Sequence, residues 1–333
     1  MTVLSLDLEL ALEHTKSYPG IQITPVIAKN GRFSKERKLL WEGMESNSVK
    51  IQEKASSSVP EVELVNESEE TFIGCKGSII RGGGQNRQLL HSFVVPKKAS
   101  IKIPVQCIQH GRWNPHHSRQ FSNRSGDVTS SSLKFSKKSQ METWQNITET
   151  ATHSGTTSMT EDYTITHDFM FGDHREAQTA LSSMTSTGMK LEKKREESRE
   201  RAQKILQETE PIEGQVGVYI HLISPEDWKK GEVKRKEFME IFASQELYKK
   251  VHKDVLTSFV ADAAMLPKDE PKIEIPALEK EQFSRFLQKI QQAPWKDKEK
   301  IGSEKRQEIV NSSEVFGESI YDEEEMVHLM CSV

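Results

Sequence analysis

The residues of this chain best suited to binding chemistry lie in two short segments, 82–87 and 110–113. Three consecutive glycines carry no Cβ and permit positive φ, so the backbone can turn sharply there and expose its N–H groups. Two amides and a guanidinium follow at once, and together they supply many donors for a carboxylate, a phosphate or a base edge. The second segment offers an arginine for an anion and a tryptophan for stacking. The predicted ligand-binding residues are Gly82, Gly83, Gly84, Gln85, Asn86, Arg87, Arg112 and Trp113.

A structural alternative stays open at both segments. Glycines between apolar runs are typical of a β-turn or bulge with solvated neighbours. An arginine can bond loop carbonyls there, and a tryptophan can cap a core. No Gly-Lys-Ser/Thr ends the run, which excludes a Walker loop, and strand-like sequence follows it, which excludes a dinucleotide fingerprint. The glycines alone therefore do not establish phosphate binding.

Cys107 and His110 are the candidate catalytic residues. A thiolate needs an adjacent imidazole to be populated at neutral pH, so this pair could act as nucleophile and base. On an extended strand, however, residues three apart point to opposite faces, and a buried structural cysteine is the alternative. The identity of a catalytic residue stays open at this point.

Several histidines lie close together in the sequence, as metal ligands often do, but their spacing does not support a metal site. His110, His116 and His117 lie close in sequence, but they match no known ligand spacing. Two adjacent histidines on an extended chain would also point to opposite sides. We therefore predict no metal and no cofactor.

Composition narrows the class of protein. The chain has 333 residues, 46 Lys+Arg and 50 Asp+Glu, and a net charge of −4, which argues against an overall electrostatic grip on nucleic acid or an anionic membrane. No run approaches the roughly 18 apolar residues of a membrane span, and the first residues lack a basic start. Three cysteines with no Cys-x-x-Cys spacing indicate neither disulfides nor a zinc site. We expect a cytoplasmic protein.

Short apolar runs at hairpin spacing predict strands throughout 60–113. Helical patterns follow at 136–152, 175–207, 237–264 and 280–292. The fold class predicted is α+β, with an antiparallel β-rich sandwich or barrel core and amphipathic helices added in the C-terminal half.

Changes in sequence character suggest a division into three parts. We predict a β-rich domain at 1–125, a helical insertion with a charged helix at 126–210, and an α+β segment at 211–333 that completes the same domain or forms a second one. Whether 175–210 packs on the core or extends into solvent stays open.

Several motifs combine in this chain in a specific way. Their segments are 58–61, 82–87, 92–96, 104–107, 111–113, 143–144, 154–156, 242–263 and 327–329. Together they resemble the prokaryotic ARG and rhodanese-phosphatase-superfamily-associated protein family. The resemblance implies a β-rich fold and a role beside ADP-ribose-processing or phosphatase-like partners in conflict or defence systems. Where that family has Asp-Gly-Glu, this chain has Lys76-Gly77-Ser78, and Gln109 replaces a glutamate, so the resemblance does not extend to carboxylate chemistry at those positions.

These observations favour a ligand- or partner-binding accessory module, with a small anionic ligand related to a nucleotide or ADP-ribose, or with a protein partner. One alternative is a hydrolase or transferase acting on a nucleotide-like substrate, with His110 or Cys107 as base or nucleophile and Arg87 and Arg112 stabilising charge. A second is a homo-oligomeric scaffold, in which the long charged helix pairs with a copy of itself. Convergence of His110, Arg87 and Arg112 on one pocket would favour the enzyme.

Overall fold

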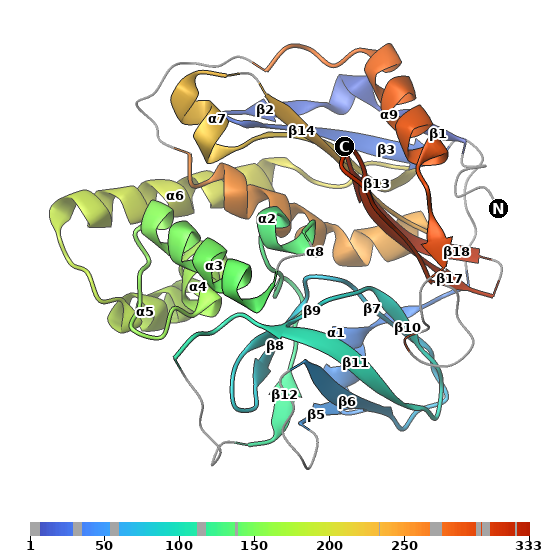
Figure 1. The fold of residues 1–333 in the computed structure, drawn as a ribbon, viewed down its shortest axis with the longest axis horizontal. Helices are drawn as coiled ribbons and strands as arrows, with labels where there is room; N and C mark the ends of the chain where they lie inside the picture. The colour runs from blue at the N-terminus through green and yellow to red at the C-terminus, as the bar shows by residue number, and fades with distance from the viewer. Residues whose placement is uncertain are drawn as a thin grey trace.

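The computed structural model describes most of the chain and places its strands in three β-structures (Figure 1). The described residues are 7–28, 35–53, 60–111, 118–136, 139–232, 234–266, 275–297, 301, 307–323 and 325–333.

The largest β-structure is a nine-stranded sheet whose strand order is β1-β3-β13-β14-β18-β17-β16-β15, with β2 paired to β3. Every pairing in it is antiparallel, and its central strand β13 is buried along its whole length. Strands from both ends of the chain therefore share one sheet. Its strands are β1 (Leu8–Leu10), β2 (Lys16–Tyr18), β3 (Ile21–Ala28), β13 (Gln215–Ile223), β14 (Arg235–Phe242), β15 (Lys296–Asp297), β16 (Gln307–Asn311), β17 (Phe316–Asp322) and β18 (Glu325–Ser332).

The second β-structure is a closed barrel in the order β11-β6-β5-β12-β8-β9. Alternate residues of β6 are buried, as expected for a strand with one face toward a core. Apolar side chains such as Ile51, Leu64, Ile103 and Phe121 fill this core. The barrel strands are β5 (Val49–Gln52), β6 (Glu61–Asn66), β8 (Ile79–Gly82), β9 (Arg87–Leu89), β11 (Ser100–Cys107) and β12 (Gln120–Ser122).

The third β-structure is a small sheet beside the barrel, made of β4 (Lys38–Leu39), β7 (Phe72–Gly74) and β10 (Phe93–Val95). Its β4–β7 pair is parallel, whereas β10 pairs with β7 antiparallel. The predicted α+β class and its antiparallel β-rich core are confirmed, and the core contains a barrel.

Helices cover both faces of the large sheet (Figure 1). α8 (Gln245–Ala263) packs against β13 and β14 in one apolar core, and α9 (Lys280–Gln292) covers the other face through Phe283, Phe286 and Ile290. The remaining helices are α1 (Leu40–Glu45), α2 (Ser131–Lys134), α3 (Gln140–Ser154), α4 (Tyr163–Phe171), α5 (His174–Ser183), α6 (Met189–Glu208), α7 (Pro225–Lys230) and a short 3₁₀ helix at Leu12–His14.

Two predicted helices need correction. The helix expected at 237–264 begins only at Gln245, because Ser244 caps it by accepting the N–H of Leu247, and the preceding residues form β14. The last five residues of β14 are all buried, which suits an inner strand, and their apolar run also fits the spacing of a helical face. The helix expected at 175–207 is divided into α5 and α6.

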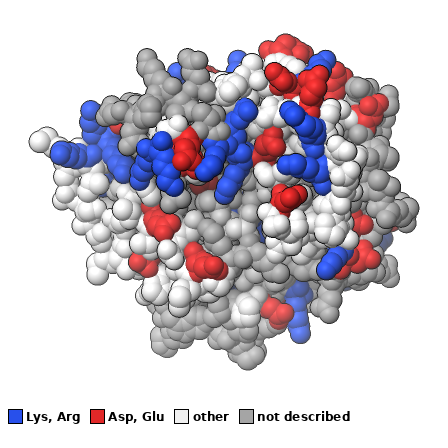
Figure 2. Space-filling view, turned by 45° about the horizontal axis from the view of Figure 1, so that its top comes forward, with Lys and Arg blue, Asp and Glu red and all other residues white. Residues whose placement is uncertain are grey.

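The long charged segment packs on the core rather than extending into solvent. Arg195, Ser198, Ala202 and Ile205 are buried along one face of α6 at helical spacing, and the last two belong to the core beneath α8. No helix among the described residues is long and apolar enough to cross a membrane. Figure 2 shows Lys and Arg side chains in a band across one face, with Asp and Glu between them. The predicted division at 125 and 210 stays a prediction.

Candidate functional site

The glycine run forms the tight connection between β8 and β9 at one end of the barrel. Gly82 and Gly83 have φ of 122° and 52°, a region that favours glycine. A Cβ on Gly83 would lie 2.5 Å from the Phe121 ring and 2.9 Å from a carboxylate oxygen of Glu53. The glycines therefore let the backbone approach both an aromatic ring and a carboxylate.

The carboxylate of Glu53 occupies the corner made by this turn. Its Oε1 accepts the backbone N–H of Gly84 at 3.0 Å and the Nη2 of Arg87 at 2.6 Å. Arg87 is 1% exposed, and its guanidinium carbon lies 5.3 Å from the centre of the Phe121 ring. The predicted donor set therefore does hold an anionic oxygen, and the chain itself supplies that oxygen. Gly84, Arg87 and Glu53 are called the anion corner below.

Arg87 is only partly satisfied by this contact. Its Nε and Nη1 are buried and have no hydrogen-bond partner among the described residues. Buried donors without acceptors are uncommon and costly, and often indicate an ion, a water or a ligand. One guanidinium edge of Arg87 therefore has capacity for further acceptor oxygens.

The neighbouring amides bind the protein itself. Asn86 accepts the N–H of Gly82 at 3.0 Å and donates to Asp162, the residue that caps α4, at 3.1 Å. Gln85 donates to the carbonyl of Gln109 at 3.1 Å. Asn86 therefore joins the barrel to α4, whereas Gln85 binds the residues at the end of β11, and ligand contact is left to the anion corner.

The candidate nucleophile Cys107 lies inside the protein. It is 0% exposed, and its thiol donates to Oε1 of Gln85 at 3.1 Å. Burial raises the pKa of the Cys107 thiol and outweighs the opposing charge of Arg87. The thiolate is therefore disfavoured, as expected for a structural cysteine.

The candidate base His110 lies on the surface instead. Its Nδ1 is 2.8 Å from Oε2 of Glu161, and its ring centre is 4.3 Å from that of Trp144. The described contacts of Cys107 and His110 thus involve different partners. The other predicted residues, Arg112, Trp113, His116 and His117, lie outside the described residues.

A second charged cluster was not predicted from the sequence. Arg81 of β8 binds Asp127 through Nε and Nη2, and it binds Asp168 of α4 through Nη1 and Nη2. Arg124 also contacts both aspartates and forms a hydrogen bond with Glu176. These residues come from distant parts of the chain, and only the adjacent pair His167-Asp168 gives a local signal.

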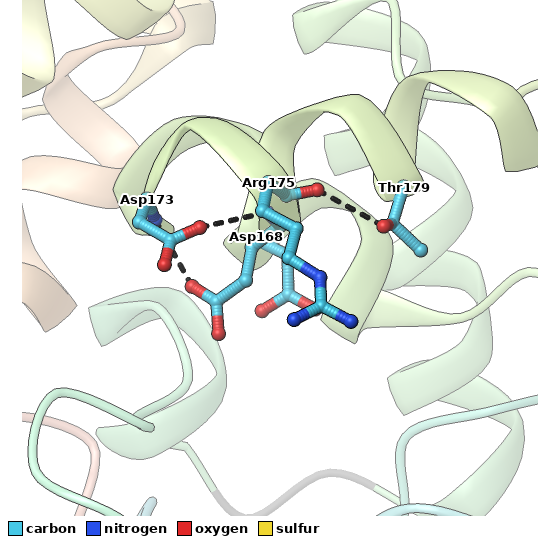
Figure 3. A pocket seen from close by; sticks show the side chains of 5 residues that line it. Asp168, Asp173, Arg175 and Thr179 are labelled. Carbon is cyan, nitrogen blue, oxygen red and sulfur yellow. Dashed lines mark hydrogen bonds between the residues drawn. The ribbon is translucent and has the colours of Figure 1, made fainter.

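This cluster borders a cavity of about 270 Å³. Figure 3 shows Asp168, Asp173, Arg175 and Thr179 around it; Glu176 completes the lining. Burial alone would raise the pKa of Asp168, but its contacts with His167 and Arg81 outweigh this effect, so the pKa is lowered. The carboxylate beside the cavity is therefore ionised at neutral pH.

A third polar network lies between the barrel and the large sheet. Ser92 Oγ is 3.0 Å from Nδ1 of His328, whose Nε2 is 3.0 Å from Oε1 of Glu240, and Lys134 Nζ is 2.7 Å from both oxygens of Glu240. A serine, a histidine and a carboxylate in line could form a nucleophilic triad. Ser92, His328 and Glu240 are all 0% exposed, however, so a substrate cannot reach the hydroxyl. The network joins two parts of the fold.

The positions that depart from the family pattern have structural contacts. Lys76 is buried; its Nζ donates to the carbonyl of Leu90 at 2.8 Å, and its backbone N–H donates to Ser92. Gln109 accepts the backbone N–H of Asn86. Lys76 and Gln109 therefore both bind neighbouring loop residues of the chain itself.

The fold and the site define an α+β protein with a closed barrel and an internally filled anion corner. The model of the ARG and Rhodanese-Phosphatase-superfamily-associated Protein domain matches residues 9–332, nearly the whole chain. The chain belongs to this family, which confirms the resemblance found in its sequence motifs. No curated protein and no solved structure matches the chain.

Proposed function

We propose that the chain is a ligand-binding accessory module and that its anion corner takes a phosphate or carboxylate of a small nucleotide-like or ADP-ribose-related ligand. One observation carries the proposal: Glu53 already places a carboxylate oxygen on Gly84 N–H and Arg87 Nη2. The ligand oxygen would replace it. Phosphate suits the corner because a planar guanidinium can bind two of its oxygens at once.

The difference in burial between the two partners supports this exchange. The side chain of Arg87 is 1% exposed and that of Glu53 is 11% exposed. Glu53 can therefore leave toward solvent while Arg87 stays in place beneath the glycine turn. A departing carboxylate also keeps the corner near neutrality when an anion enters, and the free Nε and Nη1 of Arg87 gain acceptors.

The family name is consistent with the proposed setting. It associates the domain with ARG and with rhodanese-phosphatase proteins. A module that binds a phosphate-bearing ligand fits a role beside such enzymes in prokaryotic conflict or defence systems, in the cytoplasm.

A second candidate function is hydrolysis or group transfer on a nucleotide-like substrate. The cavity beside Asp168 favours it, because His167, Asp127 and Asp168 lie together there and could position or deprotonate a water. In this alternative the reactive groups lie at the cavity, and His110 and Cys107 take no part.

Calorimetric titration with ADP-ribose, AMP and inorganic phosphate tests the proposal. Glu53→Gln keeps the shape of the internal occupant and removes its charge, so the affinity should rise about tenfold, as for the loss of a charge-assisted competitor. Arg87→Met should abolish binding. Glu67→Gln, at an exposed glutamate paired with Lys50, is the matched control and should leave the affinity unchanged.

Two results would contradict the proposal. One is the absence of binding by both the wild type and Glu53→Gln to every one of these ligands. The other is binding that Arg87→Met retains while its circular dichroism spectrum shows a folded protein.

A further inference from the structure

Three acceptor atoms converge on a single nitrogen of Arg81. Its Nη2 lies 2.6 Å from Oδ1 of Asp168, 2.9 Å from Oδ1 of Asp127 and 3.3 Å from Nδ1 of His167. The ligand atoms of Asp127, His167 and Asp168 all lie within 4.8 Å of one another. Two carboxylate oxygens and an imidazole nitrogen around one point make a typical set of metal ligands.

The orientation of His167 makes its Nδ1 available as a ligand. Its Nε2 is 2.7 Å from the carbonyl oxygen of Gly126, so Nε2 carries a hydrogen and donates it. In the neutral imidazole the lone pair is then on Nδ1, facing Asp127 and Asp168. A histidine anchored on a backbone carbonyl through its second nitrogen is the usual arrangement of a metal-binding histidine.

Arg81 does not fully satisfy this lone pair. An Nη2 nitrogen carries two hydrogens, and the two closer carboxylate oxygens take both of them. The Nδ1 of His167, a residue 3% exposed, is left next to a carboxylate oxygen at 3.3 Å with no hydrogen of its own between them. A cation that coordinates all three atoms at once would remove this deficit.

We infer that Asp127, His167 and Asp168 form a divalent-cation site, and that the Arg81 guanidinium fills its place when the metal is absent. The mixed nitrogen and oxygen set suits Mn²⁺, Fe²⁺ or Zn²⁺ better than Mg²⁺, which prefers oxygen ligands. The inference stands apart from the anion corner, and it does not depend on the proposed function.

The cavity beside Asp168 can receive the Arg81 side chain when a metal displaces it. Asp168 is shared between the cluster and the cavity, whose other lining includes the carboxylates of Asp173 and Glu176. An arginine released from Nη2 contact can turn toward these groups. The cavity also leaves room beside Asp168 for water or a substrate oxygen on the metal.

Titration of the chelator-treated full-length chain with Mn²⁺, followed by electron paramagnetic resonance of free Mn²⁺ and by calorimetry, tests the inference. The wild type should bind one ion. Arg81→Gln removes the cation that contacts all three ligand atoms and leaves Arg124 on the two aspartates, so it should raise the affinity about tenfold. His167→Gln and Asp168→Asn should lose binding.

Glu67→Gln is the control variant. Glu67 is an exposed glutamate paired with Lys50 and belongs neither to the cluster nor to the cavity, so metal affinity should stay as in the wild type. Failure of both wild type and Arg81→Gln to bind Mn²⁺ or Zn²⁺ would overturn the inference and show a structural ion-pair network. Because Arg81→Gln predicts a gain, misfolding of the other variants cannot mimic the expected result.

Discussion

Replacement of Lys134 by methionine should destabilise the protein by about 3–5 kcal/mol, the usual effect of removing one partner of a buried ion pair. Lys134 and Glu240 are 2% and 0% exposed, and the lysine nitrogen is 2.7 Å from both carboxylate oxygens. The variant keeps a buried carboxylate with His328 as its remaining side-chain partner. Methionine fills a similar volume, so the loss should come from the charge rather than from a cavity.

The double variant Lys134→Met/Glu240→Gln separates these effects. It contains no unpaired buried charge, and glutamine still offers an oxygen to His328, so it should recover about 2 kcal/mol relative to Lys134→Met alone. Burial opposes ionisation of Glu240, but Lys134 and His328 lower its pKa to about 2. The ordinary value is 4.5, so this stabilisation is present above pH 4.5 and is lost as the pH falls toward 2.

Urea denaturation at pH 7 and pH 4 measures both consequences. The difference in free energy of unfolding between the wild type and Lys134→Met should be smaller at pH 4, because the Glu240 carboxylate of the variant takes up a proton there. If the free energy of unfolding of Lys134→Met lies within about 1 kcal/mol of the wild-type value, the argument that Lys134 neutralises a buried charge is refuted. A double variant less stable than Lys134→Met would refute it as well.

Three further predictions concern other buried groups. Burial raises the pKa of Asp254 to about 6, although the N–H of Gly126 donates a hydrogen bond to this carboxylate. Because the folded pKa exceeds the ordinary 3.8, the free energy of unfolding of the wild type should fall as the pH rises from 4 to 6. In urea denaturation, Asp254→Asn should remove this pH dependence and be about 1–3 kcal/mol more stable than the wild type at pH 7. Cys107 should react with iodoacetamide at least about a hundredfold more slowly in the native than in the unfolded protein, by mass spectrometry, and equal rates would contradict its burial. Gly217→Ala should cost about 1–3 kcal/mol, since its Cβ would lie 2.2 Å from the carbonyl oxygen of Glu240, and an unchanged unfolding temperature would contradict that close approach.

The sequence predicted those elements whose residues show a local pattern, such as short apolar runs or consecutive glycines. Short apolar runs in 60–113 predicted strands, and β6, β8, β9 and β11 of the barrel lie there; β6 shows the period of two of a strand with one buried face. The barrel strands β5 and β12 lie outside that range. The glycine run was predicted to turn sharply, and Gly82 and Gly83 do have positive φ. The sequence does not distinguish β14 from a helix, because the last five residues of this strand are all buried and show no alternation, so their apolar run also fits a helix.

The contents of the sites could not be predicted in the same way. Arg87 was identified as an anion binder, but its occupant Glu53 comes from a different strand connection, and no local rule joins the two. The cluster around Arg81 is assembled only when β8 meets α4. Such groups have no common spacing in the sequence, because tertiary packing alone brings them together.

Selective ¹⁵N labelling of glycine and arginine, with spectra recorded during titration with ADP-ribose, locates the bound anion most directly. The account predicts that the Gly84 amide and the Arg87 Nε–H signals shift together and saturate at one equivalent, and that Glu53→Gln saturates at a lower ligand concentration. Shifts confined to Arg175 and the cavity beside Asp168, with Gly84 and Arg87 unchanged, would contradict the claim that the anion corner is the binding site.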